Sequence, residues 1–230
     1  RTIFSFIPNT AETAYYGLMD GLRLHRRQQV RASILKASDE GNLTPELVDD
    51  LILRNWPQGE KVAHKDIKMR TFISQEKGRD QMVSHVYDIT YGVVNPGDCL
   101  VALDDSIVRG TTSMKIVQMM RDAGAAEVHM RVASPPTMHS CFYGVDTPER
   151  SKLLAARMDI QEMTKFIVAD SLGFVSIDGL YRAVGEPGRN SACPQHCDAC
   201  FTGDYPTKLT DLAEREADTG QLPLSVGQVA

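Results

Sequence analysis

Residues 99–133 restrict the fold more than any other part of the chain. An apolar run at 99–103 is typical of a buried strand, and a polar loop follows it. Apolar residues then recur at helical spacing through 113–123, Gly124 ends that pattern, and a second strand-like run covers 128–133. Strand, loop, helix and strand at these lengths predict a right-handed βαβ crossover between two parallel strands.

The neighbouring segments continue the alternation of strands and helices. Residues 2–7 predict a buried strand ended by Pro8, and a helix is predicted at 11–24, capped by Asn9 or Thr10. The alternation favours an α/β fold in which a mainly parallel sheet carries helices on both faces. Further helices are predicted at 26–54, with a break at 41–45, and at 152–156, 161–168 and 178–183, and a short strand is predicted at 174–175.

The length of 230 residues allows one sizeable α/β core with extensions. We expect residues 1–185 to form this core, with 25–60 as a candidate helical insertion. Residues 186–230 are expected to form an irregular, cysteine-containing extension and tail. The chain begins at Arg1, without a Met and almost directly in a strand-like run, so we expect a fragment of a longer protein.

Composition excludes several classes of protein. The net charge of -5 gives no basic excess that would attract nucleic acid or an anionic membrane. No apolar run reaches the roughly 20 residues of a membrane-spanning helix, and we find no signal peptide. An odd number of cysteines, five, argues against a disulfide framework. We therefore expect a cytoplasmic protein that binds neither nucleic acid nor membrane.

The polar loop after residues 99–103 combines two kinds of binding group. Asp104 and Asp105 stand at the carboxyl end of a predicted strand, which is where ligands bind in open parallel sheets. Gly110 permits a tight turn, and the helix N-terminus that follows suits a phosphate. The alternative is a capped helix after a surface turn. The remaining polar residues of the loop and first helical turn are Ser106, Arg109, Thr111, Thr112 and Ser113.

The string Asp-Asp-Ser-Ile-Val-Arg-Gly-Thr-Thr at 104–112 resembles the phosphoribosylpyrophosphate (PRPP) motif of type I phosphoribosyltransferases. The particular residues of this string resemble those of the glutamine PRPP amidotransferases, and residues 197–206 resemble the tail of their iron–sulfur members. The resemblance covers 97–206 well and 1–24 fairly, and it is weak across 25–60. The other stretches that carry it are Ser134-Pro-Pro with 141–146, then 169–180, and Cys-Asp-Ala-Cys-Phe-Thr-Gly-Asp-Tyr-Pro at 197–206.

The resemblance implies a role for each residue of the motif. Asp104 and Asp105 would contact the ribose hydroxyls of PRPP and its bound Mg²⁺, as the preference of Mg²⁺ for carboxylates allows. Many family members have a serine where this chain has Ala11, so either Thr10 would supply the hydroxyl of the first loop or the two sequences align one residue apart. The remaining PRPP-binding residues would be Ser106, Arg109, Gly110, Thr111, Thr112 and Ser113, with Arg70, Lys68 and Lys65 from a closing basic loop, for which a solvated basic face is the alternative.

The family's reaction is displacement of pyrophosphate from PRPP by ammonia to give 5-phosphoribosylamine, the first committed step of de novo purine biosynthesis. No covalent nucleophile is implied. The resemblance also implies a glutaminase domain elsewhere in the full-length chain and a homo-oligomer, so we expect no glutamine-dependent activity from this fragment. The rivals are a non-catalytic PRPP-sensing module and a phosphoribosyltransferase whose acceptor is a nucleobase.

Three cysteines match the family's cluster ligands. The resemblance implies that Cys141, Cys197 and Cys200 hold a [4Fe–4S] cluster, with the fourth ligand outside this chain. Cys193 as that ligand, a four-cysteine zinc site and thiols without a metal are the alternatives. Cys99 begins a strand and is expected to be a buried thiol.

Overall fold

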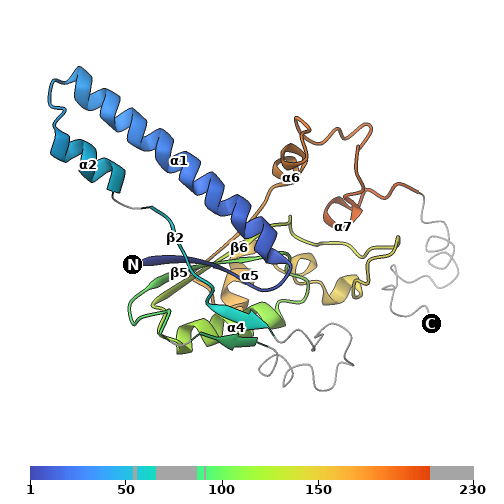
Figure 1. The fold of residues 1–230 in the computed structure, drawn as a ribbon. Helices are drawn as coiled ribbons and strands as arrows, with labels where there is room; N and C mark the ends of the chain where they lie inside the picture. Colours follow the sequence, from blue (N-terminus) through green and yellow to red (C-terminus); the bar gives the residue numbers. More distant parts are fainter. Residues whose placement is uncertain (54–55, 66–86, 91, 208–230) are drawn as a thin grey trace, which may run out of the picture.

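The computed structural model describes residues 1–53, 56–65, 87–90 and 92–207. Its centre is a five-stranded sheet in which every neighbouring pair is parallel, in the order β2-β1-β5-β6-β7 (Figure 1). The predicted α/β class is thus confirmed, as is the parallel crossover from β5 through α4 to β6. The strands are β1 (Thr2–Phe6), β2 (Gln58–Gly59), β5 (Cys99–Asp104), β6 (Glu127–Val132) and β7 (Ser171–Phe174), and α4 is Thr111–Asp122.

Helices cover both faces of this sheet because the apolar residues of β5 alternate. Leu100 and Ala102 are fully buried on one face of the sheet. The apolar side chains of α4 and of α5 (Ile160–Phe166) pack against that face. Leu103 points to the other face and packs with Phe6 and with the first turns of α1 (Ala11–Asp39). The apolar clusters on the two faces of the sheet both contain residues of β1 and β5, so burial on each face holds these strands side by side. The α4 stripe that the first cluster buries is Ile116, Val117 and Met120.

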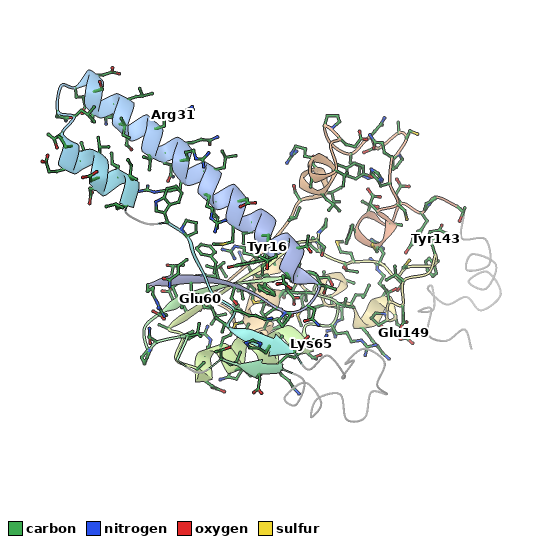
Figure 2. All side chains as sticks on the ribbon, in the orientation of Figure 1. Tyr16, Arg31, Glu60, Lys65, Tyr143 and Glu149 are labelled. Carbon is green, nitrogen blue, oxygen red and sulfur yellow. The ribbon has the colours of Figure 1, made fainter. Side chains whose placement is uncertain are left out.

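The first helix differs from the prediction. We expected one helix at 11–24 and another after residue 26, but α1 is continuous over 29 residues. Its second half is rich in arginine, glutamine and other good helix formers, and no proline interrupts it, so local propensity carries the helix beyond the sheet. The predicted break is confirmed, since Gly41 adopts a φ of 69° and α2 (Pro45–Leu53) begins beyond it. Figures 1 and 2 show α1 running outward from the sheet, with Arg31 on its distant part and α2 folded back beside it.

Two later predictions were wrong in detail. Residues 152–156 form no α-helix but lie within two 3-10 turns, Arg150–Lys152 and Leu154–Ala156. The amide of Leu154 donates to the carbonyl of Val108 at 2.8 Å, so this segment is held against the β5–α4 loop rather than following its own propensity. The predicted strand at 174–175 lies earlier in the chain, at β7, because pairing with β6 selects Ser171–Phe174.

The remaining elements flank the sheet. β3 (Ala63–Lys65) and β4 (Tyr87–Ile89) form an antiparallel pair. After β7, the chain forms α6 (Ile177–Ala183) and the short α7 (Ala199–Thr202), which lie together in Figure 1. Among the described residues, no helix has the length and apolar character needed to cross a lipid bilayer.

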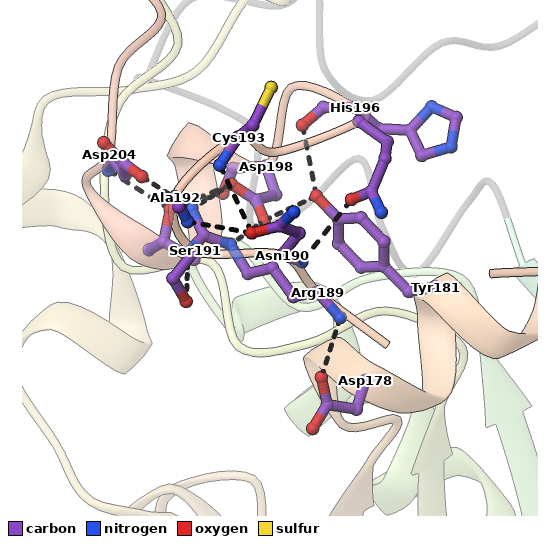
Figure 3. Close-up of polar contacts among 12 residues, drawn as sticks. Asp178, Tyr181, Arg189, Asn190, Ser191, Ala192, Cys193, His196, Asp198 and Asp204 are labelled. Carbon is purple, nitrogen blue, oxygen red and sulfur yellow. Dashed lines mark hydrogen bonds and ion pairs between the residues drawn. The ribbon is translucent and has the colours of Figure 1, made fainter. Parts of the chain in front are cut away.

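A buried ion pair organises the segment between α6 and α7 (Figure 3). Asp198 is 3% exposed and accepts hydrogen bonds from Arg189, from the hydroxyl of Tyr181 at 3.0 Å and from Thr202 at 3.1 Å. Burial alone would raise the pKa of Asp198, but these hydrogen bonds outweigh it and lower that pKa. Arg189 also pairs with Asp204 at 2.7 Å, so one guanidinium holds both ends of α7, while the amide of Arg189 donates to Asp178 of α6 at 3.0 Å.

Candidate functional site

A pocket of about 320 Å³ opens where β1 and β5 end. The two strands pair in register up to Phe6 and Leu103, and the amide of Ile7 continues the ladder to the carbonyl of Leu103 at 2.8 Å. The loop after β1 and the loop after β5 therefore meet at the same edge of the sheet. The pocket is lined by Ile7, Pro8, Thr10, Tyr87, Asp104, Asp105, Ser106, Val108, Arg109, Gly110, Thr111, Thr112, Ser113, Asp146 and Pro148.

The acidic pair forms one wall of the pocket, and its two members have different surroundings. Asp104 is 9% exposed, and its Oδ1 accepts a hydrogen bond from the amide of Asp105 at 2.9 Å. Burial raises the pKa of Asp104 to about 8, and the neighbouring charge of Asp105 adds to that effect. Asp105 is half-buried and accepts hydrogen bonds from the hydroxyls of Thr10 and Ser106. The pair thus combines a buried carboxyl group whose surroundings favour its protonated form with a neighbour that reaches solvent.

The first loop reaches the acidic pair through Thr10. This residue occupies the N-cap position of α1, but its hydroxyl donates to Asp105 and makes no capping hydrogen bond. Ala11 is fully buried in the apolar cluster between α1 and the sheet. The hydroxyl that faces the pocket from this loop thus comes from Thr10.

The opposite wall is the N-terminus of α4, which begins immediately after Gly110. Gly110 has a φ of 79°, in the left-handed region that favours glycine. A Cβ at this position would lie 2.6 Å from Leu154 Cδ2 and 3.1 Å from Phe166 Cε1, so space as well as conformation requires glycine. The first amides of a helix have no partner within it and carry partial positive charge. Thr111, Thr112 and Ser113 line the pocket at this end.

Tyr87, which the sequence had not indicated, closes a third side of the pocket, and Lys65 lies beside it. The ammonium of Lys65 lies 5.5 Å from the centre of the Tyr87 ring, and Figure 2 shows Lys65 at the end of β3. Burial raises the pKa of Tyr87 to about 12, with the charges of Asp104 and Asp105 adding to it. Lys65 in turn lowers the pKa of Asp104, against the larger effect of burial. A cation and a neutral phenol therefore stand beside the acidic pair.

Several residues fall outside the motif or outside the described chain. Asp146 and Pro148 also line the pocket, and sequence reasoning gave them no role, although Asp146 belongs to a stretch that resembles the family. Only tertiary structure brings them here, because they follow β6 by more than ten residues. Lys68 and Arg70, expected to close over the ligand, lie outside the described residues.

The three cysteines expected to hold a cluster lie near one another, and none of them lines this pocket. The carbonyl of Cys200 accepts hydrogen bonds from the amides of Met138 and His139 at 2.9 and 3.0 Å, which brings the segment of Cys141 against α7. Burial raises the pKa of the Cys200 thiol, and the nearby Cys141 and Cys197 add to that rise.

Cysteine thiolates hold two kinds of metal centre in proteins, iron–sulfur clusters and single zinc ions. Several thiolates suit an iron–sulfur cluster. The sulfur atoms of Cys141, Cys197 and Cys200 do not all lie within 4.8 Å of one another, the spacing that a single ion requires. Each iron of a cluster takes its own thiolate, so a cluster tolerates the wider spacing. Cys193 is exposed, and Cys99 is half-buried rather than buried as expected, because it begins a strand at the rim of the sheet.

Curated proteins of similar sequence include members of the family that the motif at 104–112 resembles. The amidophosphoribosyltransferase of Rhizobium etli is 62% identical over 116 residues, which cover 50% of this chain. The chain is homologous to part of the amidophosphoribosyltransferases. The Bacillus subtilis amidophosphoribosyltransferase is 47% identical over 141 residues, and Amidophosphoribosyltransferase 2, chloroplastic, of Arabidopsis thaliana is 50% identical over 151. These matches cover 61% and 65% of this chain, respectively. No protein-family model matches the chain.

Solved structures extend the match over most of the chain. The B. subtilis glutamine PRPP amidotransferase complexed with ADP and GMP superimposes with a TM-score of 0.61 and 35% identity over 90% of this chain. A structure described as the allosteric regulatory enzyme of purine biosynthesis gives a TM-score of 0.59 and 33% identity over the same share. The chain spans only about a quarter of the length of the three curated relatives named above, 23%, 29% and 26%, and 38% of each solved chain.

Proposed function

We propose that this chain binds Mg²⁺–PRPP and transfers its phosphoribosyl group to ammonia, giving 5-phosphoribosylamine and pyrophosphate. The observation that carries the proposal is the pocket at the ends of β1 and β5, which combines an acidic pair with the N-terminus of α4. The homology to amidophosphoribosyltransferases supports the same assignment. The activity would be that of a pentosyltransferase in purine biosynthesis.

The acidic wall would hold the ribose hydroxyls and the metal. Mg²⁺ prefers one or two carboxylates together with ligand oxygens and retained waters, and Asp104 and Asp105 offer that set. A divalent cation here would favour the ionised form of Asp104 and so oppose the burial that raises its pKa to about 8. The hydroxyls of Thr10 and Ser106, which donate to Asp105, would orient its carboxylate toward the ligand.

The opposite wall would hold the 5′-phosphate of the sugar. The amides at the start of α4 point toward the pocket end of the helix, where the helix dipole favours an anion. The left-handed Gly110 starts the helix without a side chain, so a phosphate can approach the backbone closely. The residues assigned to this end are Arg109, Gly110, Thr111, Thr112 and Ser113.

The proposed reaction is a direct displacement and needs no nucleophile from the protein. The nitrogen of ammonia forms a bond to C1 of the ribose, the C1–O bond to pyrophosphate breaks, and the product amine loses one proton to solvent. Negative charge develops on the departing pyrophosphate, and the cationic Lys65 and Arg109 beside the pocket would stabilise it. Bound Mg²⁺ would supply further neutralisation of that leaving group.

The remaining assignments concern the longer protein. Cys141, Cys197 and Cys200 would provide three ligands of a [4Fe–4S] cluster, with the fourth outside this chain. A glutaminase domain of the full-length chain would supply ammonia, in a cytoplasmic homo-oligomer. Within this chain, residues 1–185 would form the phosphoribosyltransferase domain and 186–230 the cysteine-containing extension.

Pyrophosphate release tests the proposal directly. The anaerobically purified chain is given Mg²⁺–PRPP with either ammonia or glutamine, and the double variant Asp104→Asn/Asp105→Asn is compared with wild type. Asp20→Asn is the matched control, because the side chain of Asp20 is 78% exposed on α1 and forms an ion pair with Arg23, one turn along the same helix. We expect release with ammonia alone, lost in the double variant and kept in the control.

PRPP binding, measured by calorimetry, separates the ways in which the proposal can fail. Binding that depends on the acidic pair, without release, would replace the enzyme by a PRPP-sensing module. Absence of both binding and release would reject the assignment of the pocket. Release with glutamine would contradict the separation of this chain from a glutaminase.

A further inference from the structure

A second group of potential ligands lies at the opposite end of the strands from the PRPP pocket. Cys99 is the first residue of β5, and it stands opposite Glu127, the first residue of β6, in the parallel register. His129 is two residues further along β6, so its side chain leaves the same face of the sheet as that of Glu127. The sheet thus brings together a thiol, a carboxylate and an imidazole from residues that are up to 30 positions apart.

The spacing of this group suits a single metal ion. One ligand atom from each of Cys99, Glu127 and His129 lies within 4.8 Å of the other two, and no other such trio occurs in the described part of the chain. His129 Nε2 and Glu127 Oε2 are 3.1 Å apart. Ligands of a tetrahedral zinc ion, at bond lengths of about 2.0–2.3 Å, stand about 3–4 Å from each other. Small side-chain rotations would therefore complete the coordination.

A hydroxyl on β7 lies beside the second ring nitrogen of this imidazole. His129 Nδ1 lies 2.8 Å from the hydroxyl oxygen of Ser171 on β7. The same oxygen accepts a hydrogen bond from Arg131 at 3.0 Å, and its second lone pair can accept the Nδ1 proton. In the tautomer that carries the proton on Nδ1, Nε2 keeps its lone pair and can bind an ion held beside Glu127. Metal-binding histidines commonly use a hydrogen bond from the other ring nitrogen in this way.

The group is also accessible from solvent. The side chain of Glu127 is 59% exposed and that of His129 is 23% exposed, while Cys99 is half-buried. An ion can thus reach the site from water, keep a water molecule as its fourth ligand, and be shielded on one side by the sheet.

We propose that Cys99, Glu127 and His129 form a zinc-binding site that links the first residues of β5 and β6. The thiolate and the carboxylate neutralise the two charges of Zn²⁺, and the imidazole is the neutral third ligand. The site is separate from the cysteines of the extension, since it uses only residues of the sheet. It lies at the amino ends of the strands, so its role is to stabilise the sheet and not to take part in phosphoribosyl transfer.

Alkylation followed by peptide mapping tests this site one cysteine at a time. The chain is treated with iodoacetamide with and without added Zn²⁺, and mass spectrometry gives the alkylation rate of each of its five cysteines. We expect Zn²⁺ to protect Cys99 in the wild type and in Cys197→Ser, but not in His129→Gln or Glu127→Gln. Ser171→Ala should need about 10–100-fold more Zn²⁺ for the same protection, because it removes the orienting partner of His129 and leaves all three ligands in place.

Loss of zinc binding in a variant must be distinguished from loss of folding. Glu127 is exposed, so Glu127→Gln is expected to fold normally, and circular dichroism checks each variant. Equal alkylation of Cys99 with and without Zn²⁺ in the wild type would overturn the proposal, as would protection that persists in His129→Gln. Thermal unfolding gives a second measurement: saturating Zn²⁺ should raise the Tm of the wild type by about 5–10 °C and that of Cys99→Ser by much less.

Discussion

Asp104→Asn should stabilise the metal-free protein at neutral pH while abolishing PRPP binding. Burial raises the pKa of Asp104 to about 8, whereas an unfolded chain gives an aspartate a pKa of about 3.9. Between these two values the folded protein holds a proton that the unfolded chain has released. Stability therefore falls as pH rises through this interval, and the penalty levels off above about pH 8. Asparagine has the same shape, still accepts from the amide of Asp105 and carries no charge to bury.

The size of the effect follows from the interval between the two pKa values. One pKa unit corresponds to about 1.4 kcal/mol, so the penalty at neutral pH, about three units above the unfolded value, is about 4 kcal/mol. The substitution should recover much of this free energy of unfolding at neutral pH but only about half a kcal/mol near pH 4, where the folded Asp104 is protonated and the unfolded one is about half protonated. The stabilised variant loses the carboxylate that we assign to the metal, a trade between stability and function that is common at active sites.

Urea denaturation in the presence of a chelator measures this difference. The free energy of unfolding is determined for wild type, Asp104→Asn and Asp105→Asn from about pH 4 to about pH 8. Asp105→Asn should recover a smaller part of the same free energy, because the charge of Asp105 helps to raise the pKa of Asp104 and its removal lowers that pKa. A difference between wild type and Asp104→Asn that is the same at both ends of the pH range would refute the argument, because it would mean that Asp104 has the same pKa in both states.

Three further predictions concern other parts of the molecule. Gly110→Ala should cost about 2–4 kcal/mol through backbone strain and a steric clash, whereas Gly41→Ala, which has a similar φ but no atom within 4 Å, should cost about 1 kcal/mol; urea denaturation compares them. Arg189→Met should destabilise by about 3–5 kcal/mol because it leaves the buried Asp198 unpaired, and limited proteolysis of the extension should accelerate in it but far less in Arg189→Lys. In wild type, the stability from the lowered pKa of Asp198 is present above the unfolded value of 3.8 and is lost as pH falls below it. Thr10→Val should weaken Mg²⁺–PRPP binding about tenfold, since one hydrogen bond to a charged group is lost, and calorimetry would disprove this if the affinity were unchanged.

Local sequence determined the central unit of the fold. The apolar strand at the start of residues 99–133, the helical spacing that follows and Gly124 belong to one short stretch, and their patterns reflect burial that each element achieves against its nearest neighbours. For the same reason the acidic pair and the hydroxyls of the first turn of α4 could be predicted to share one loop. Local pattern was less informative for α1, whose continuous helix depends on propensity beyond the amphipathic part, and for residues 152–156, whose 3-10 turns depend on a contact with Val108.

Tertiary structure decided everything that depends on residues distant in the chain. Thr10 and Asp105 are 95 positions apart and meet because β1 and β5 pair in parallel, so their carboxyl ends share one edge of the sheet. Burial, which no single residue type specifies, sets the protonation of Asp104. The register of β5 against β6 places Cys99 beside Glu127 at the other end of the strands, although nothing in the spacing of the sequence pairs them. Pattern along a chain reports which face a side chain takes, whereas register and burial depend on which strands become neighbours.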